Sequence, residues 1–271
     1  IALSRGKELI PLRDELEQLT GDELAALLQG DGVALDTSGA WAEFVGDGNV
    51  GTNKRVDVGG IVLTNNTHGN YELVLPEDLR ASITERRVVI GGLGVADRFY
   101  DGTRLAQLTG LATAVLRDEL KQLTDDALAA LLQSDGVELS TVDAWAEFVG
   151  NGNAGTNKLV EVGGFALTGS GAGNYTLVLP ADLRASIMER PVVIGGLGVL
   201  DKVYDGTQTA TLVGLDSVTL HDQLGEFDAD RLAALLQSDG VELSASGAWA
   251  EFAGNGNAGT NKLVEVGGFA L

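Results

Sequence analysis

The acidic residues that end two glycine-rich segments are the residues of this sequence best suited to bind a metal ion. GGLGVAD at 91–97 and GGLGVLD at 195–201 approach the calcium-binding pattern GGxGxD, although Asp97 and Asp201 each come one residue late. That pattern normally repeats in contiguous rungs, whereas calcium generally takes carboxylate, carbonyl and amide oxygens. Asp97 and Asp201 are thus candidate calcium ligands beside the simpler interpretation of these segments as turns, and no other cofactor is expected.

Residues suited to catalysis are few. The chain has two histidines, His68 and His221, and no cysteine. Ala172 and Arg117 stand 104 residues from them, so neither histidine belongs to the pattern that the rest of the chain repeats. Carboxylates such as Glu23 lie at predicted helix starts, where they complement the free N–H groups and the helix dipole. No catalytic residue is identified, and the sequence does not predict an enzyme.

The elements that must position these residues recur along the chain. Trp41, Trp145 and Trp249 are spaced by 104 residues, and no insertion or deletion breaks this spacing. Between 128–167 and 232–271, only four of 40 positions differ. A unit of this length has the size of an independent domain. The sequence therefore predicts tandem domains of about 104 residues, arranged as beads on a string.

Three domains follow from this spacing. The first is expected at 1–86 and is incomplete at its N-terminus, the second at 87–190 is complete, and the third at 191–271 is incomplete at its C-terminus. Pro191 marks the second border, because proline interrupts strand pairing. Missing strands would leave open sheet edges, so the parent chain is expected to continue at both ends.

Each unit is predicted to be mainly β with a short helical insertion, in a β-sandwich-like or β-grasp-like fold. Residues 116–136 carry apolar side chains at three- and four-residue steps, which indicates a helix of two short pieces. Thr20 and Glu23 form a capping box in the first unit. Alternating segments bounded by Gly, Asn, Asp or Pro are typical of strands. In the second unit these segments are 95–99, 137–140, 145–149, 158–162, 165–169, 175–180 and 183–187.

The tryptophans raise a separate question of packing or binding. In an extended strand Trp145 and Phe148 point to opposite faces, so Phe148 is expected in the core. Trp145 is then expected to pack between layers, under the predicted helix. The alternative is a binding site, because an exposed tryptophan ring can stack on a sugar. The candidate residues for packing or interaction are Trp41, Trp145 and Trp249.

Several motifs occur in a fixed order: YDGT at 100–103, NAGTNK at 153–158, GNY at 173–175 and LRASIMERPVVI at 183–194. Together they resemble the YDG-type repeat of large bacterial surface and secreted proteins, including filamentous-haemagglutinin-like adhesins and two-partner-secretion exoproteins. The resemblance implies an extracellular, tandemly repeated, β-rich domain that serves as a stalk in adhesion and biofilm proteins. It implies no catalytic residues.

Charge and composition narrow the range of partners. A net charge of −21 disfavours nucleic acid and anionic membrane surfaces, and no apolar run approaches the roughly 20 residues of a membrane span. The expected function is a structural stalk or spacer of a secreted or cell-surface bacterial adhesin or matrix fibre, whose partners are its neighbouring repeats. Two alternatives remain: a module that recognises a host or matrix glycan or protein, and a homopolymer that assembles by strand addition.

Overall fold

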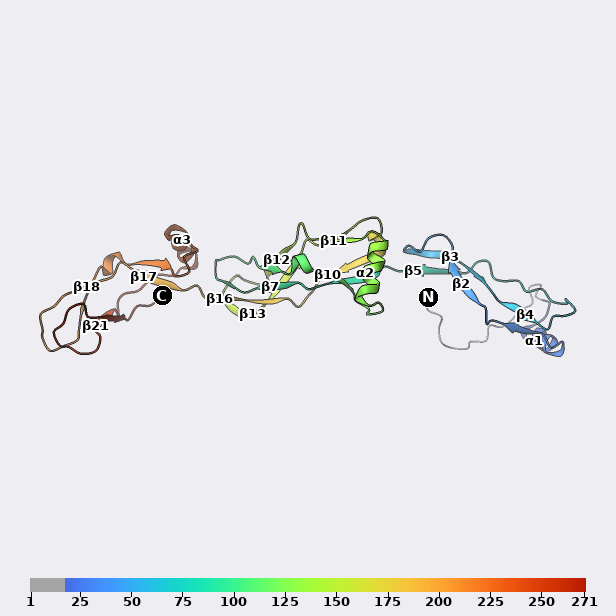
Figure 1. Cartoon of the computed structure of the whole chain (residues 1–271), viewed down its shortest axis with the longest axis horizontal. Coiled ribbons are helices and arrows are strands. Elements are labelled where there is room, and N and C mark those ends of the chain that lie inside the picture. The colour runs from blue at the N-terminus through green and yellow to red at the C-terminus, as the bar shows by residue number, and fades with distance from the viewer. Residues whose placement is uncertain (1–17) are drawn as a thin grey trace. The chain divides into compact units, whose positions relative to one another are not determined.

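The computed structural model describes residues 18–271, which are rich in β-structure (Figure 1). This part of the chain contains three α-helices and 22 strands, so the predicted β-rich character with short helices is confirmed. Residues 1–17 of the expected first domain lie outside the described residues. By spatial contacts the chain forms two compact units, which are described separately below.

The first unit comprises residues up to 88 together with 118–138 and 167–177. Its helix α1 (Gly21–Gly30) begins with the predicted capping box, in which Thr20 Oγ1 accepts the Glu23 N–H and Glu23 accepts the Thr20 N–H at 2.9 Å. One sheet has the order β2-β3-β5 and a second pairs β1 with β4. The bounds are β1 (Ala34–Asp36), β2 (Trp41–Phe44), β3 (Gly51–Gly59), β4 (Val62–Thr64), β5 (Arg80–Ile83), α2 (Asp125–Ser134) and the 3-10 turn Ala172–Asn174.

The second unit comprises 89–117, 139–166 and 178–271. Its largest sheet has the order β12-β13-β16-β8. The bounds are β7 (Gly94–Ala96), β8 (Arg98–Phe99), β9 (Gln107–Thr109), β12 (Trp145–Phe148), β13 (Gly155–Gly163), β16 (Arg184–Met188), β17 (Val192–Gly195), β18 (Gly198–Leu200), β19 (Thr211–Val213), β20 (Thr219–Asp222), α3 (Ala229–Asp239), β21 (Trp249–Phe252) and β22 (Val264–Gly267). Short 3-10 turns lie at Leu111–Thr113 and Leu215–Ser217.

Five further strands have residues in both units: β6 (Arg86–Gly91), β10 (Val115–Asp118), β11 (Glu138–Ser140), β14 (Ala166–Thr168) and β15 (Tyr175–Val178). The strands predicted from the sequence in the second expected domain occur with ends that shift by a few residues, except that the strand predicted at 95–99 is two strands, β7 and β8, interrupted at Asp97. None of the helices within residues 18–271 is long and apolar enough to cross a membrane.

The hydrophobic core of the second unit lies on one face of its largest sheet. Phe148 is fully buried, and Val160 and Ile187 are 1% and 2% exposed. They alternate with outward residues along β12, β13 and β16, as the two-residue period of a strand requires. Val95, Tyr100 and Leu108 pack against them. The prediction that Phe148 belongs to the core is confirmed.

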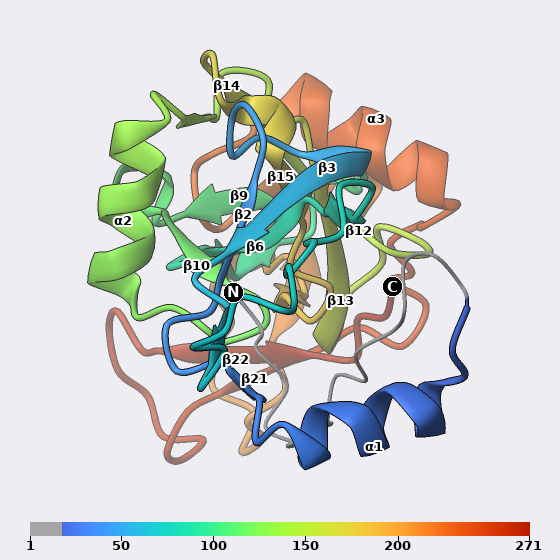
Figure 2. The same ribbon diagram turned by 90° about the vertical axis from the view of Figure 1, so that its right-hand side faces the viewer.

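The helix predicted over 116–136 is shorter than expected. Residues 116–118 belong to strand β10, and only Asp125–Ser134 is helical (Figure 2). A tight turn separates the two, because the Asp118 carboxylate accepts the N–H groups of Gln122 and Leu123 at 2.7 and 2.9 Å. Lys121 within this turn has a left-handed φ of 54°, which a helix does not allow. The apolar spacing that suggested a longer helix therefore belongs to a strand, a turn and a helix in succession.

The core of the largest sheet supplies a first prediction. We expect Phe148→Ala to lower the free energy of unfolding by about 3–5 kcal/mol, because it leaves a cavity around a fully buried ring. Phe252→Ala is the matched control, since Phe252 has the same strand context but is only half-buried. Urea unfolding followed by circular dichroism measures both. Equal losses for the two variants would contradict the assignment of Phe148 to the core.

Candidate functional site

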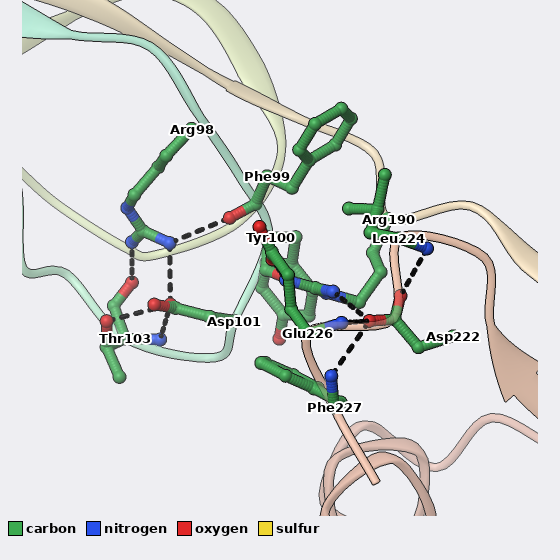
Figure 3. A network of polar contacts seen from close by, with 10 residues as sticks. All are labelled: Arg98, Phe99, Tyr100, Asp101, Thr103, Arg190, Asp222, Leu224, Glu226 and Phe227. Atoms are coloured by element: carbon green, nitrogen blue, oxygen red, sulfur yellow. Dashed lines mark hydrogen bonds and ion pairs between the residues drawn. The ribbon is translucent and has the colours of Figure 1, made fainter.

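Arg190 and Asp222 form a buried ion pair between two parts of the second unit that are distant in sequence. The Arg190 Nη1 lies 2.8 Å from the Asp222 Oδ2, and the side chains are 5% and 0% exposed. Arg190 also donates to the Glu226 carboxylate at 2.9 Å and, through Nε, to the main-chain oxygen of Tyr100 at 2.6 Å. Its guanidinium carbon lies 3.8 Å from the ring centroid of Phe227. One side chain thus joins four neighbours (Figure 3).

The Asp222 carboxylate orders the loop that follows it. It accepts main-chain N–H groups from Leu224, Glu226 and Phe227 at 3.4, 2.9 and 3.0 Å (Figure 3). Burial by itself raises the pKa of Asp222, but hydrogen bonds from the Phe227 N–H and from Arg190 outweigh it and hold that pKa below its ordinary value. The aspartate therefore stays charged, and its buried charge is satisfied by donors on several sides.

The first unit contains the same arrangement 104 residues earlier. Arg86 Nη1 lies 3.0 Å from the Asp118 Oδ2, and the Asp118 side chain is 1% exposed. Burial by itself raises the pKa of Asp118, but the hydrogen bonds from Leu123, Gln122 and Arg86 outweigh it and hold that pKa below its ordinary value. Sequence reasoning missed both pairs. The available signal was an arginine that ends each expected domain and an aspartate 32 residues later, each of which recurs at the spacing of 104 residues.

The tyrosine of the YDGT motif lies beside the Arg190 pair. Its main-chain oxygen accepts from Arg190, and its hydroxyl donates to Asp239 at the end of α3 at 2.9 Å. Burial and the hydrogen bond to Asp239 raise the pKa of Tyr100. Tyr100 is therefore attached through its main chain to Arg190, just before Pro191, and through its side chain to Asp239, beyond Pro191.

The rest of the motif is a turn closed by a cation. The Asp101 Oδ1 accepts the N–H and the hydroxyl of Thr103, both at 2.8 Å, and lies 2.6 Å from Arg98. Arg98 in turn donates to the main-chain oxygens of Phe99 and Thr103 (Figure 3). Gly102 has a φ of +80°, which a residue with a side chain rarely adopts. Aspartate, glycine and threonine are thus needed together for the turn itself.

Lysine takes the place of arginine in the second YDGT turn. Lys202 Nζ lies 2.9 Å from the Asp205 carboxylate and from both the main-chain and hydroxyl oxygens of Thr207. The hydrogen bond from Lys202, followed by those from Thr207, lowers the pKa of Asp205 to about 2. The turn therefore forms with either cation.

The tryptophans are half-exposed, so the expectation that Trp145 is buried under a helix is wrong. Trp145 is 45% exposed. It pairs with Gly163 across the β12–β13 hairpin, and its ring lies so close that a Cβ on Gly163 would meet it at 2.4 Å. Glycine at this position lets the ring lie flat on the neighbouring strand. The same ring-on-glycine contact joins Trp41 to Gly59 and Trp249 to Gly267, with the tryptophans 51% and 47% exposed.

The calcium candidates do not form a cluster. The Asp97 Oδ1 accepts the N–H of Ser186 on β16 at 2.6 Å, and Asp201 is exposed. Across residues 18–271 no three His, Cys, Asp or Glu side chains lie close enough to hold a metal ion. Asp97 thus has a role in strand pairing, and calcium binding stays a prediction.

The comparisons with known proteins agree with this geometry in one respect. The fold and the cation-closed turn define a β-rich domain built around a Tyr-Asp-Gly-Thr motif. Residues 84–183 match the family model of the YDG domain, which includes the turn at 100–103. Comparison with curated proteins and with solved structures found no match. A YDG domain is therefore present in the middle of the chain.

The buried ion pair predicts a pH-dependent loss of stability on Asp222→Asn. At neutral pH we expect the free energy of unfolding to fall by about 3 kcal/mol, since the buried Arg190 then keeps only the exposed Glu226 carboxylate as a counter-ion. Because the folded pKa of Asp222 is below the unfolded one, its stabilisation is present above about pH 4 and is lost as the pH falls through the folded pKa. The difference in free energy of unfolding between wild type and variant should therefore become smaller in acid.

Urea unfolding at several pH values between neutral and strongly acidic measures this difference. Asp216→Asn, at an exposed aspartate of the same region, is the matched control and should change stability little. If wild type and Asp222→Asn differed in free energy of unfolding by the same amount in acid as at neutral pH, the charge of Asp222 would not be what stabilises the loop.

Proposed function

We propose that the chain is a non-catalytic structural region, a stalk or spacer of a secreted bacterial adhesin or biofilm-matrix fibre, built from units of about 104 residues. The observation that carries this proposal is the buried Arg190–Asp222 pair. Arg190 is the last residue of the expected second unit and Asp222 belongs to the expected third. A spacer needs joints that fix the relative orientation of the segments they connect. The Arg190–Asp222 contact holds together the residues before and after Pro191.

The chain around this joint leaves little freedom. Only three residues separate β16, which ends at Met188, from β17, which begins at Val192. Arg190 is held by a carbonyl, two carboxylates and an aromatic ring, and Pro191 has a fixed φ. A planar guanidinium with several fixed partners orients both sides of a contact, as a single flexible ammonium does not. The recurrence of the pair at Arg86 and Asp118 supports the same joint at the other expected border.

Composition supports the proposed location. The chain contains no cysteine and has a net charge of −21, which keeps repeated domains soluble and apart from one another. For units of this kind we propose a β-sandwich-like or β-grasp-like arrangement, with the neighbouring units as the main partners.

The stiffness of the joint can be measured with two spin labels. Because the chain has no cysteine, Val142→Cys and Leu263→Cys label two exposed positions on either side of Arg190 selectively. We expect a narrow distance distribution in the otherwise wild-type chain and a broad one after Arg190→Ser. Arg55→Ser, which removes an exposed ion pair with Asp57, is the control and should leave the distribution narrow. A distribution that is already broad before Arg190 is changed would rule out a stiff spacer.

The exposure of the tryptophans favours a second function, recognition of a glycan or a protein. Three rings that are 45–51% exposed and equally spaced in sequence could each offer a stacking face to a sugar. Titration with soluble polysaccharides, followed by tryptophan fluorescence, tests this. If the rings bind, the emission shifts on titration and the shift decreases with each Trp→Phe change. Unchanged emission, in a protein whose tryptophans are quenched by acrylamide, would leave the spacer as the better proposal.

A further inference from the structure

Two loops of the second unit contain an asparagine that is followed by a glycine. Asn151-Gly152 lies between β12 and β13, and Asn255-Gly256 lies at the equivalent place between β21 and β22. In the whole sequence no other asparagine precedes a glycine. Both asparagines are exposed. In each loop an asparagine side chain therefore lies in contact with water and next to a main-chain nitrogen that can react with it.

The YDGT turns require the glycine of each pair. A Cβ on Gly152 would meet the main-chain oxygen of Thr103 at 2.2 Å, and one on Gly256 would meet that of Thr207 at 3.0 Å. Glycine also leaves its main-chain nitrogen unshielded, because it has no Cβ. The contact with the turn thus retains the residue that least hinders attack by the main chain on the preceding side chain.

Hydrogen bonds to the side-chain oxygens favour that attack. The Asn151 Oδ1 accepts a hydrogen bond from Lys158 Nζ at 3.1 Å and another from the Asn153 N–H at 3.3 Å. Such donors stabilise the negative charge that develops on a carbonyl oxygen when a nucleophile adds to its carbon. The Asn255 Oδ1 likewise accepts the Asn257 N–H at 3.2 Å. Addition to Cγ is therefore assisted at both asparagines.

The first unit contains an aspartate where these loops contain an asparagine. Asp47 stands 104 residues before Asn151. Its Oδ1 lies 2.9 Å from the Nζ of Lys54, the counterpart of Lys158, and its Oδ2 accepts the side-chain amide of Asn49 at 2.8 Å. The same loop sequence thus accommodates a carboxylate, with a cation and an amide donor as its partners.

We propose that Asn151 and Asn255 are sites of spontaneous deamidation, and that the aspartate formed takes the position that Asp47 has in the first unit. This goes beyond the proposed spacer role, which does not require it.

The reaction needs only water as a second reactant. The Gly152 nitrogen adds to the Asn151 Cγ and loses its proton, while the bond from Cγ to the side-chain nitrogen breaks and that nitrogen leaves as ammonia. The product is a cyclic imide, a succinimide. Water then opens the ring. Breaking the bond between the Gly152 nitrogen and Cγ gives aspartate, and breaking the bond to the main-chain carbonyl gives isoaspartate.

The two products differ in their effect on the loop. Aspartate adds a negative charge next to Lys158 and leaves the path of the main chain unchanged. Isoaspartate adds the same charge, but the main chain then passes through Cγ and is longer by one carbon. That extra carbon moves Gly152 relative to Thr103. Deamidation therefore changes the contact between this loop and the YDGT turn.

Peptide mapping of the aged protein tests the proposal. The folded chain is kept at physiological temperature and pH in water labelled with heavy oxygen and is then digested in ordinary water, so that only acid formed during ageing has labelled side chains. Trypsin releases Asn151 in the peptide 122–158 and Asn255 in the peptide 232–262. Since glycine shields its nitrogen least, we expect the label to enter these side chains about tenfold faster than those of Asn153 and Asn257, which precede alanine.

Asn151→Gln is the matched control, because a glutamine side chain would have to form a larger and less favourable ring. It should abolish the label at this position and leave that at Asn255 unchanged. Label that enters Asn153 and Asn257 as fast as Asn151, or that enters none of them, would overturn the proposal. So would loss of ammonia without uptake of label, because Lys158 would then have formed an amide with the Asn151 Cγ.

The position of the new carboxylate is tested with Asn151→Asp and an NMR titration of its side chain. We expect the pKa of this carboxylate to lie below the ordinary value, because Lys158 is within reach of it, as Lys54 lowers the pKa of Asp47. Adding Lys158→Gln should return that pKa to the ordinary value. An ordinary pKa with and without Lys158 would show that the carboxylate does not take the position of Asp47, and would overturn this part of the proposal.

Discussion

The structure depends on aspartates that hold loops by accepting main-chain N–H groups while a basic side chain balances their charge. Asp222 with Arg190 is the most complete case, because the carboxylate orders Leu224–Phe227 and the guanidinium reaches back to Tyr100. Most strands in the described chain are only three or four residues long. Such strands bury little apolar surface, and the loops between them need fixed donors and acceptors of their own. Part of the acidity of the chain is therefore structural.

This dependence also explains the YDGT motif. A glycine with positive φ and an aspartate that accepts from the threonine form the turn. A basic residue three positions before the aspartate, Arg98 or Lys202, closes it by pairing with the carboxylate. The tyrosine that begins the motif then lies where Arg190 reaches its oxygen. The four-residue motif thus has a structural role, in the turn itself and in the contact with Arg190.

The sequence predicted the local elements well and the contacts between distant segments poorly. Alternation and turn residues placed β12 and β13, and the opposite faces of Trp145 and Phe148 followed from strand geometry. The helix was overextended because Leu116, Leu120 and Leu123 satisfy a helical spacing that the Asp118 turn interrupts. The Arg190–Asp222 pair spans 32 residues, and nothing local to either residue indicates its partner.

Identical local sequence also meets different surroundings in this chain. WAEF forms the same hairpin with a tryptophan opposite a glycine in β2, β12 and β21, so its pairing is encoded locally. Its burial is not: Phe148 is fully buried, while Phe252 is half-buried in the same local pattern. In the sheet of Phe148 both β16 and β8 follow β13, whereas only β5 follows β3 beside the half-buried Phe44, and no strand follows β22 in the described chain. A hairpin's register can therefore be read from its own residues, whereas its core depends on which neighbour completes the sheet.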